Sequence, residues 1–481
     1  MVIARKIAYN VVVSSVSKIL STVLALLSIG LITRYLGASG FGEYATVLAF
    51  LALFSAIADL GLYSTATREI SRPNADESKI IGNIFSLRLI ISSIVLLLSP
   101  AVFWFLPYPL EVKEAILIIA ASFLFSSSYQ VLNGVFQKNL AMDKVAMIEL
   151  FGKIIQVTVI FVVIKLQLGF LWIIASLLFN MIFSFTAVYA LSKKYISFTL
   201  RFDMAYWKAF LKESYPLGIA AFIGFVYFKV DTILLSVMKN SAEVGIYNAA
   251  YKVIENITFF PTMMAGLIFP IMSQTIFVDF ARFKDVSDKT YKIFWIFAVA
   301  LVIGTMFLSG GIVDLIGGSG FEKSELVLRI LIFALAAIFF SNFSNSILIA
   351  GNKQKKLMVI MFLAAVFNVS ANLIFIPKYS YIASAWISVL TELFVVAATF
   401  YVMIKELRYF PVVERFYGIL ASGAVMAGYF FFFKSLNFFV LAISGTLVYA
   451  AALWMFGAIK TTDISSIITK KGEKESMLIS Q

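Results

Sequence analysis

Residues 9–33 read YNVVVSSVSKILSTVLALLSIGLIT, an apolar run in which Lys18 is the only charged side chain. A helix needs about 20 predominantly apolar residues to cross a hydrocarbon core of roughly 30 Å, so this run is long enough to span a membrane. The short basic start, residues 1–6, leads into it without a small-residue cleavage site. This pattern favours a retained first helix over a removed signal peptide.

Apolar runs of this kind recur along the chain as far as residue 458. Of the 481 residues, 61% are hydrophobic and 14% are charged, whereas soluble domains average about 45–50% and about 25%. The runs are continuous, unlike the alternating strands of a membrane barrel. We predict an all-α polytopic membrane protein with about fourteen transmembrane helices. The predicted spans are 9–33, 42–66, 84–106, 114–136, 145–164, 169–192, 215–238, 244–272, 291–311, 326–350, 356–376, 381–404, 413–433 and 437–458.

Lysine and arginine are distributed unevenly between the loops of this arrangement. When alternate loops are grouped, roughly 25 basic residues lie on the side of the N-terminus and roughly 7 on the other, as expected of cytoplasmic and external loops. We therefore predict that both termini are cytoplasmic and that the chain lies in the cytoplasmic (inner) membrane. The formal net charge of +13 is then explained by contacts with anionic membrane lipids, and we expect no nucleic-acid partner.

Residues typical of several enzyme classes are missing. The chain has no Cys and no His, which excludes disulfides, thiolate nucleophiles, zinc and haem sites and histidine proton relays. The segment FGKIIQ around Lys153 lacks the glycine spacing and the hydroxyl of an ATP-binding phosphate loop. The longest external loop, 309–325, offers few catalytic side chains. We expect a transporter with no catalytic residues, metal or cofactor, which draws on a H⁺ or Na⁺ gradient or on the membrane potential.

An internal repeat divides the chain into two halves. A shift of 203 residues places Gly42 and Tyr44 of GFGEY on Gly245 and Tyr247 of EVGIY. A shift of 212 relates Gln130 to Asn342, Asn133 to Asn345, Lys144 to Lys356, Gln156 to Asn368 and Ser176 to Ser388. Six helices therefore recur in the same orientation, and we expect the halves to be related by an axis along the membrane normal.

This repeat predicts four parts. They are an N-terminal six-helix lobe (1–194), an interfacial linker helix (195–213), a C-terminal six-helix lobe (214–404), and two additional transmembrane helices with a cytoplasmic tail (405–481). In the linker we expect Trp207 and Phe210 to face lipid, and a plain solvated linker is the alternative. Pro216 should then lie in the first turn of the next span, where its missing N–H costs little.

Ionisable side chains inside membrane helices are the candidates for function, because each costs a few kcal/mol and so usually faces a cavity or a partner. The candidate substrate-binding cations are Lys229, Lys252, Arg34, Arg88 and Lys18. The repeat places uncharged Leu26 and Ala49 opposite the first two, which suggests a specific role for these lysines. The alternative is a structural ion pair of Lys252 with Glu255, or of Lys229 with Asp231.

Carboxylates and amides complete the set of candidates. The possible coupling carboxylates are Asp59, Asp231, Glu255 and Glu392; buried carboxyls bonded to neighbouring serines are an equal alternative. The possible sugar contacts are Gln130, Asn133, Asn342 and Asn345, which repeat on one face of the fourth and tenth spans. Interhelical hydrogen bonds are the slightly favoured alternative for these amides.

Three segments carry a family resemblance. They are LITRYLGASGFGEYATV (31–47), VDTILLSVMKNSAEVGIYNAAYKV (230–253) and NLIFIPKYSYIASAWISVLTEL (372–393). In their order along nearly the whole chain they resemble the polysaccharide and O-antigen flippases (Wzx-type) of the multidrug/oligosaccharidyl-lipid/polysaccharide (MOP) transporter superfamily. The resemblance implies a two-lobed, V-shaped carrier that exports a polyprenyl-linked oligosaccharide by alternating access, with cations in its cavity. Polysaccharide assembly proteins are then possible partners.

Two other transport functions stay open on the sequence alone. A cation-coupled multidrug exporter of the same superfamily would favour an acidic cavity, whereas the intramembrane charges here are slightly cationic. A lipid II flippase would share the two lobes and the two extra helices. The sequence does not separate these functions from oligosaccharide export.

Overall fold

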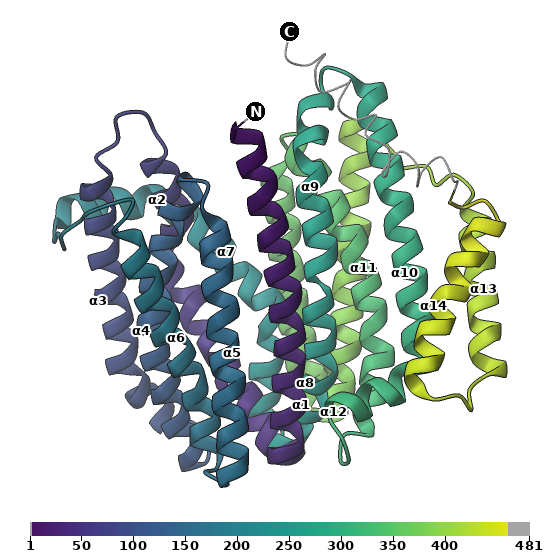
Figure 1. The fold of residues 1–481 in the computed structure, drawn as a ribbon, viewed down its shortest axis with the longest axis horizontal. Helices are drawn as coiled ribbons and strands as arrows, with labels where there is room; N and C mark the ends of the chain where they lie inside the picture. The colour runs from purple at the N-terminus through teal and green to yellow at the C-terminus, as the bar shows by residue number, and fades with distance from the viewer. Residues whose placement is uncertain (1, 460–481) are drawn as a thin grey trace. The chain divides into compact units, whose positions relative to one another are not determined.

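The computed structural model describes residues 2–459, apart from the side chains of 2–8, 11 and 100–103, and these residues form fourteen helices and no strand (Figure 1). The helices are α1 (Val2–Asp59), α2 (Leu62–Ile70), α3 (Glu77–Trp104), α4 (Leu110–Lys138), α5 (Met142–Leu166), α6 (Phe170–Ser192), α7 (Met204–Met238), α8 (Ser241–Ile257), α9 (Phe259–Thr275), α10 (Phe280–Ile316), α11 (Lys323–Ala350), α12 (Gln354–Leu407), α13 (Phe416–Phe432) and α14 (Phe438–Met455).

The helices confirm a multi-pass membrane protein. Eleven stretches of the described chain are helical, long and apolar enough to cross a bilayer. Two of them, α1 and α12, each hold two predicted spans, because their backbones leave the helical conformation at Gly37 (φ 66°) and Ser380 (φ 52°). α13 is a shorter apolar helix. The prediction of an all-α protein with about fourteen spans is therefore confirmed.

The kink of α12 is stabilised from the turn between α7 and α8. The Lys239 ammonium donates a hydrogen bond to the Pro377 carbonyl at 3.0 Å, and the Ser380 hydroxyl donates to the Glu243 carboxylate. Carbonyl groups near a kink lose their helical partners and need other donors, above all in a membrane. These two side chains therefore stabilise a conformation that a serine alone would disfavour.

The second span of the first half is interrupted, whereas that of the second half is not. In the first half, α1 ends at Asp59 and α2 begins at Leu62, because Leu60 (φ 47°) and Gly61 (φ 71°) are left-handed. In the second half, α8 ends at Ile257 and α9 begins at Phe259, but Thr258 between them keeps helical backbone angles (φ −57°, ψ −21°), so the two helices form one continuous stretch.

The seventh span differs from its prediction. α7 is continuous from Met204 to Met238, so Pro216 lies inside a long helix rather than in its first turn, and residues 195–203 are not helical. Trp207 and Phe210 do not face lipid; both are buried in an apolar cluster, and the Trp207 indole donates to the Asn83 carbonyl at 3.0 Å. These aromatic rings pack on α3, which provides apolar contacts and a backbone acceptor together.

The chain forms two compact units. The first contains the chain up to Ala249 together with Asp314–Ser324 and Met361–Ile387. Within it, α3, α4, α5 and α6 stand side by side, and α4 packs on both α3 and α6 (Figure 1). Its core includes Ile81, Leu132 and Phe136, all fully buried. The lobes 1–194 and 214–404 are drawn on the sequence repeat and stay a prediction.

The second unit contains Ala250–Val313, Glu325–Ile360 and the described residues from Ser388 onward. In it, α13 and α14 form a pair whose buried side chains include Ile419 and Phe430. The Tyr449 hydroxyl donates to the Ile296 carbonyl at 2.9 Å and so joins α14 to α10. The two additional helices are thereby packed against this unit.

Candidate functional site

Two glycines matched by the repeat meet at a close helix crossing inside the first unit. A Cβ atom on Gly42 of α1 would lie 1.7 Å from the Ser241 carbonyl oxygen, and one on Gly245 of α8 would lie 1.9 Å from the Ala38 carbonyl oxygen. The shift of 203 residues relates Ala38 to Ser241 as well. Each helix thus presents a pair of small residues, four positions apart, to the other helix: Ala38 and Gly42 on α1, and Ser241 and Gly245 on α8. Such pairs allow membrane helices to approach closely.

A second reciprocal contact lies at the same end of this unit. The Thr33 hydroxyl donates to the Ile316 carbonyl at 2.5 Å, where α10 ends. Its repeat counterpart, Ser236, is hydrogen-bonded to the Tyr108 hydroxyl at 2.8 Å, in the turn after α3. In each half, the hydroxyl near the end of the first span therefore bonds to the end of the third span of the other half.

Arg34 takes part in the same contact. Its guanidinium donates to the carbonyls of Asp314 and Leu315 at 3.1 and 2.9 Å. These are among the last carbonyls of α10, at the negative end of the helix dipole, and the Asp314 carbonyl also accepts from the Gly318 amide at 3.2 Å. The structure therefore places this predicted cavity cation on a helix terminus, although its side chain is exposed.

Arg88 and Asp59 form an ion pair at the break between α1 and α2. The Arg88 side chain is 0% exposed, and its Nη2 lies 2.5 Å from the Asp59 carboxylate, whose side chain is 27% exposed. Arg88 also contacts the Ser127 hydroxyl at 3.4 Å, while its Nε has no hydrogen-bond partner among the described residues. A predicted substrate cation and a predicted coupling carboxylate are thus partners of each other.

Lys252 and Glu255 form a second ion pair near the C-terminal end of α8. Their N–O distance is 2.7 Å, and their side chains are 17% and 36% exposed. This is the structural pairing that the sequence left open. Asp231, in contrast, is buried and accepts hydrogen bonds from the Tyr247 hydroxyl and the Thr232 amide.

The remaining predicted charges lie apart from these pairs. Lys18 is exposed on the first part of α1, and Lys229 is partly exposed on α7. Glu392 is buried on α12 and accepts a hydrogen bond of 3.4 Å from the Ser341 hydroxyl. This serine contact matches the structural alternative for the carboxylates. Within the described residues no cluster of His, Cys, Asp and Glu is able to hold a metal ion.

The four amides lie partly buried on α4 and α11. Asn342 donates to the Ile338 carbonyl at 2.9 Å and contacts the Thr262 hydroxyl of α9 at 3.5 Å. The side-chain oxygens of Asn133 and Asn345 are buried and accept no hydrogen bond from any described residue. Gln130 lies one turn before Asn133 on the same helix.

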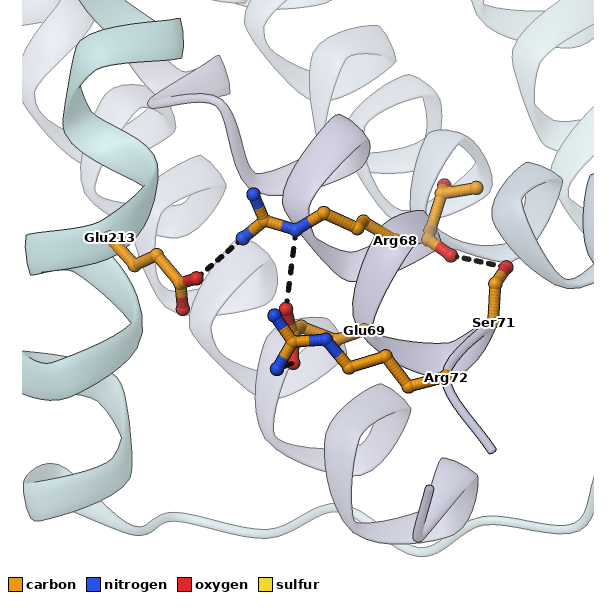
Figure 2. Close-up of polar contacts among 6 residues, drawn as sticks. Arg68, Glu69, Ser71, Arg72 and Glu213 are labelled. Carbon is orange, nitrogen blue, oxygen red and sulfur yellow. Dashed lines mark hydrogen bonds and ion pairs between the residues drawn. The ribbon is translucent and has the colours of Figure 1, made fainter. Parts of the chain in front are cut away.

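A cluster of charged residues lies at the C-terminal end of α2 (Figure 2). Arg68 lies 2.6 Å from Glu213 of α7 and 3.3 Å from Glu69, which also pairs with Arg72 at 2.9 Å. The Arg68 and Glu213 side chains are 51% and 48% exposed. The cluster therefore joins α2 to the start of α7 through solvent-accessible pairs.

We expect Arg68→Ala to have a small effect on stability, because exposed ion pairs contribute about 0–1 kcal/mol and are screened by salt. Thermal unfolding of the purified protein should show a slight decrease at low salt and none at high salt. A large decrease at both salt concentrations would mean that the cluster has a greater role than a surface pair.

Solved transporter structures share this fold. The chain aligns with the lipid II flippase MurJ in an inward closed conformation at a TM-score of 0.75 and 17% identity, covering 92% of this chain and 98% of that one. An inward-facing multidrug resistance MATE transporter of the MOP superfamily aligns at a TM-score of 0.64 and 14% identity, covering 82% of this chain and 98% of that one. A MOP superfamily transporter from Pyrococcus furiosus aligns at a TM-score of 0.56 and 14% identity, covering 83% of this chain and 96% of that one. The fold is thus that of the MOP membrane transporters.

The family follows from the sequence comparison. The sequence model of the polysaccharide biosynthesis protein family matches residues 7–276, more than half of the chain, which therefore belongs to this family. The chain is also 22% identical over 301 residues to the capsular polysaccharide biosynthesis protein CapF of Staphylococcus aureus, covering 61% of this chain and 74% of CapF. The resemblance seen in the sequence is confirmed.

Proposed function

We propose that the protein is a flippase that exports a lipid-linked oligosaccharide across the cytoplasmic membrane by alternating access, for surface polysaccharide biosynthesis. The reciprocal crossing at Gly42 and Gly245 is the observation that carries this proposal. It joins the two sequence halves at one end through close backbone contacts, which a small tilt of either helix would break. Alternating access in repeat transporters requires such a reversible closure. The family and the CapF relative support the substrate class.

The distribution of basic residues supports the orientation. Both termini are cytoplasmic in this proposal, which places the crossing of α1 and α8 at the external ends of the spans that it joins. A substrate with a large polar head then enters from the cytoplasmic side and leaves when the crossing separates.

The substrate's phosphate groups need fixed positive charge in place of water. Lys252, Lys229 and Lys18 are the proposed contacts, because their side chains are exposed or partly exposed. Arg34, bonded to the Leu315 carbonyl, and Arg88, paired with Asp59, are proposed to hold the structure; Lys252 is likewise paired, with Glu255. The amides of α4 and α11 are the proposed sugar contacts.

Transport is proposed to draw on a H⁺ or Na⁺ gradient or on the membrane potential. Asp231 and Glu392 are the proposed coupling carboxylates, because they are buried and are bound by hydroxyl groups. Asp59 and Glu255 are less suited to this role, since each is paired with a cation. Membrane lipids and polysaccharide assembly proteins are the proposed partners.

Reconstitution in liposomes tests the proposal. The wild type is expected to translocate a fluorescent polyprenyl-pyrophosphate oligosaccharide, whereas Lys229→Ala and Lys252→Ala should transport at least about tenfold more slowly at matched insertion, because a charge-assisted contact contributes about 1.5–3 kcal/mol. Lys289→Ala is the control, since this lysine forms an exposed pair with Asp285. Unchanged transport in the two variants would remove both lysines from the binding site.

The same assay separates the alternative functions. Transport of lipid II in preference to other glycolipids would indicate a lipid II flippase. Failure to move any glycolipid, together with export of a cationic dye, would indicate a multidrug exporter and contradict the proposed function.

A further inference from the structure

The sequence repeat provides an internal comparison for the pair Lys252–Glu255. The shift of 203 residues places Lys252 on Ala49 and Glu255 on Ala52. The corresponding helix of the first half therefore forms with two alanines where the second half has an ion pair. A partly exposed ion pair contributes only about 0–1 kcal/mol to stability. The fold that both halves share thus has no need for these two charges.

The position of the pair gives it access to a ligand. Lys252 lies about 16 Å along α8 from its first residue, at a rise of about 1.5 Å per residue, which places it inside the membrane region. Its side chain retains 17% exposure, and that of Glu255 retains 36%. An ionisable group at this depth normally faces a cavity or a partner rather than lipid. Arg88, in contrast, is fully buried, so no substrate reaches it in this structure.

The chemistry of the two partners suggests an exchange. A lysine ammonium is a compact charge with three donors, and it binds phosphate oxygens as readily as carboxylate oxygens. Glu255 therefore presents to Lys252 the same kind of anionic oxygen that a lipid-linked pyrophosphate would present. While the carboxylate is bound at 2.7 Å, it competes with any phosphate for the ammonium.

We infer that Glu255 acts as an internal substitute for the substrate's phosphate: it neutralises Lys252 in the empty carrier, gives way to the headgroup on loading, and rebinds Lys252 to promote release. This inference rests on the proposed function. It assigns Glu255 a role in specificity and turnover, in place of the coupling role considered from the sequence.

Glu255→Gln is the direct test, because it keeps the size of the side chain and removes the competing charge. The probe is farnesyl pyrophosphate, a short polyprenyl pyrophosphate. We expect it to bind the purified full-length variant about fivefold more tightly than the wild type. This ratio corresponds to a free energy of up to about 1 kcal/mol for the Lys252–Glu255 ion pair that the probe no longer has to displace. Turnover in liposomes should decrease, because release is slowed. Tighter binding with slower transport is a combination that loss of a structural pair would not produce.

Two further variants complete the experiment. Asp285→Asn, which removes the partner of the exposed Lys289, should leave affinity and turnover unchanged. Lys252→Ala/Glu255→Ala copies the first half and should insert and fold like the wild type while losing affinity for the probe. Misfolding of this double variant would show that the pair is structural and overturn the inference.

The outcomes also separate the inference from the proposed function. If the wild type binds the probe and Glu255→Gln binds it equally or more weakly, the inference is wrong and the flippase proposal stands. If the wild type neither binds the probe nor moves any glycolipid, the proposed function is wrong and the inference falls with it.

Discussion

Gly42→Ala and Gly245→Ala are each expected to reduce transport by about tenfold or more and to lower thermal stability. The added methyl group would lie 1.7 or 1.9 Å from a backbone carbonyl oxygen of the opposite helix, where neither atom is at the end of a flexible side chain. Overpacking of this kind costs about 1–3 kcal/mol, and about 1.4 kcal/mol corresponds to a factor of ten in a population. The liposome assay and thermal unfolding measure the two effects.

Gly224→Ala and Gly266→Ala provide matched controls on α7 and α9. No heavy atom lies within 4 Å of a Cβ built at either position. Alanine is about 1 kcal/mol more favourable than glycine inside a helix, so these variants should be as stable as the wild type or more stable. If the two crossing variants behaved like these controls, the crossing would have no role in closing the carrier.

Asp59→Asn is expected to cause the largest loss of stability, because it leaves the fully buried charge of Arg88 without a counter-ion. Removing one partner of a buried pair costs about 3–5 kcal/mol, and the partial exposure of Asp59 favours the lower end of this range. Thermal unfolding of the purified variant should show a clearly lower midpoint. The yield of folded protein recovered from the membrane should also be lower. Asp285→Asn, at an exposed pair, should show neither effect.

The double variant Asp59→Leu/Arg88→Met separates the pair from its surroundings. Since an uncharged pair leaves no isolated charge, it should recover much of the stability that Asp59→Asn loses. A double variant as unstable as Asp59→Asn would mean that the two residues do not act as a pair.

Most of the fold could be predicted from the sequence, because the bilayer imposes a simple rule on length and polarity. Runs such as 9–33 and 326–350 are long and predominantly apolar, and both are helical in the structure. The repeat-matched glycines were also visible. Their direct contact was not, because a shift in sequence gives no distance between the two copies.

The partners of the charged residues were harder to predict. Spacing along a helix anticipates pairs such as Lys252–Glu255. It gives no indication that Asp59 meets Arg88 on another helix, or that Arg34 binds the end of α10. The same limit explains the linker. Trp207 and Phe210 carry the residue pattern of a membrane surface, yet α3 offers a closer apolar environment, and only the three-dimensional fold brings it near.

The crossing of α1 and α8 has the geometry of an isologous interface, in which one patch meets a copy of itself across a two-fold axis. In this single chain the two sides of the contact are separate stretches of sequence, so the two halves are free to diverge. The charges found only in the second half, at Lys252 and Glu255, are one result of that freedom.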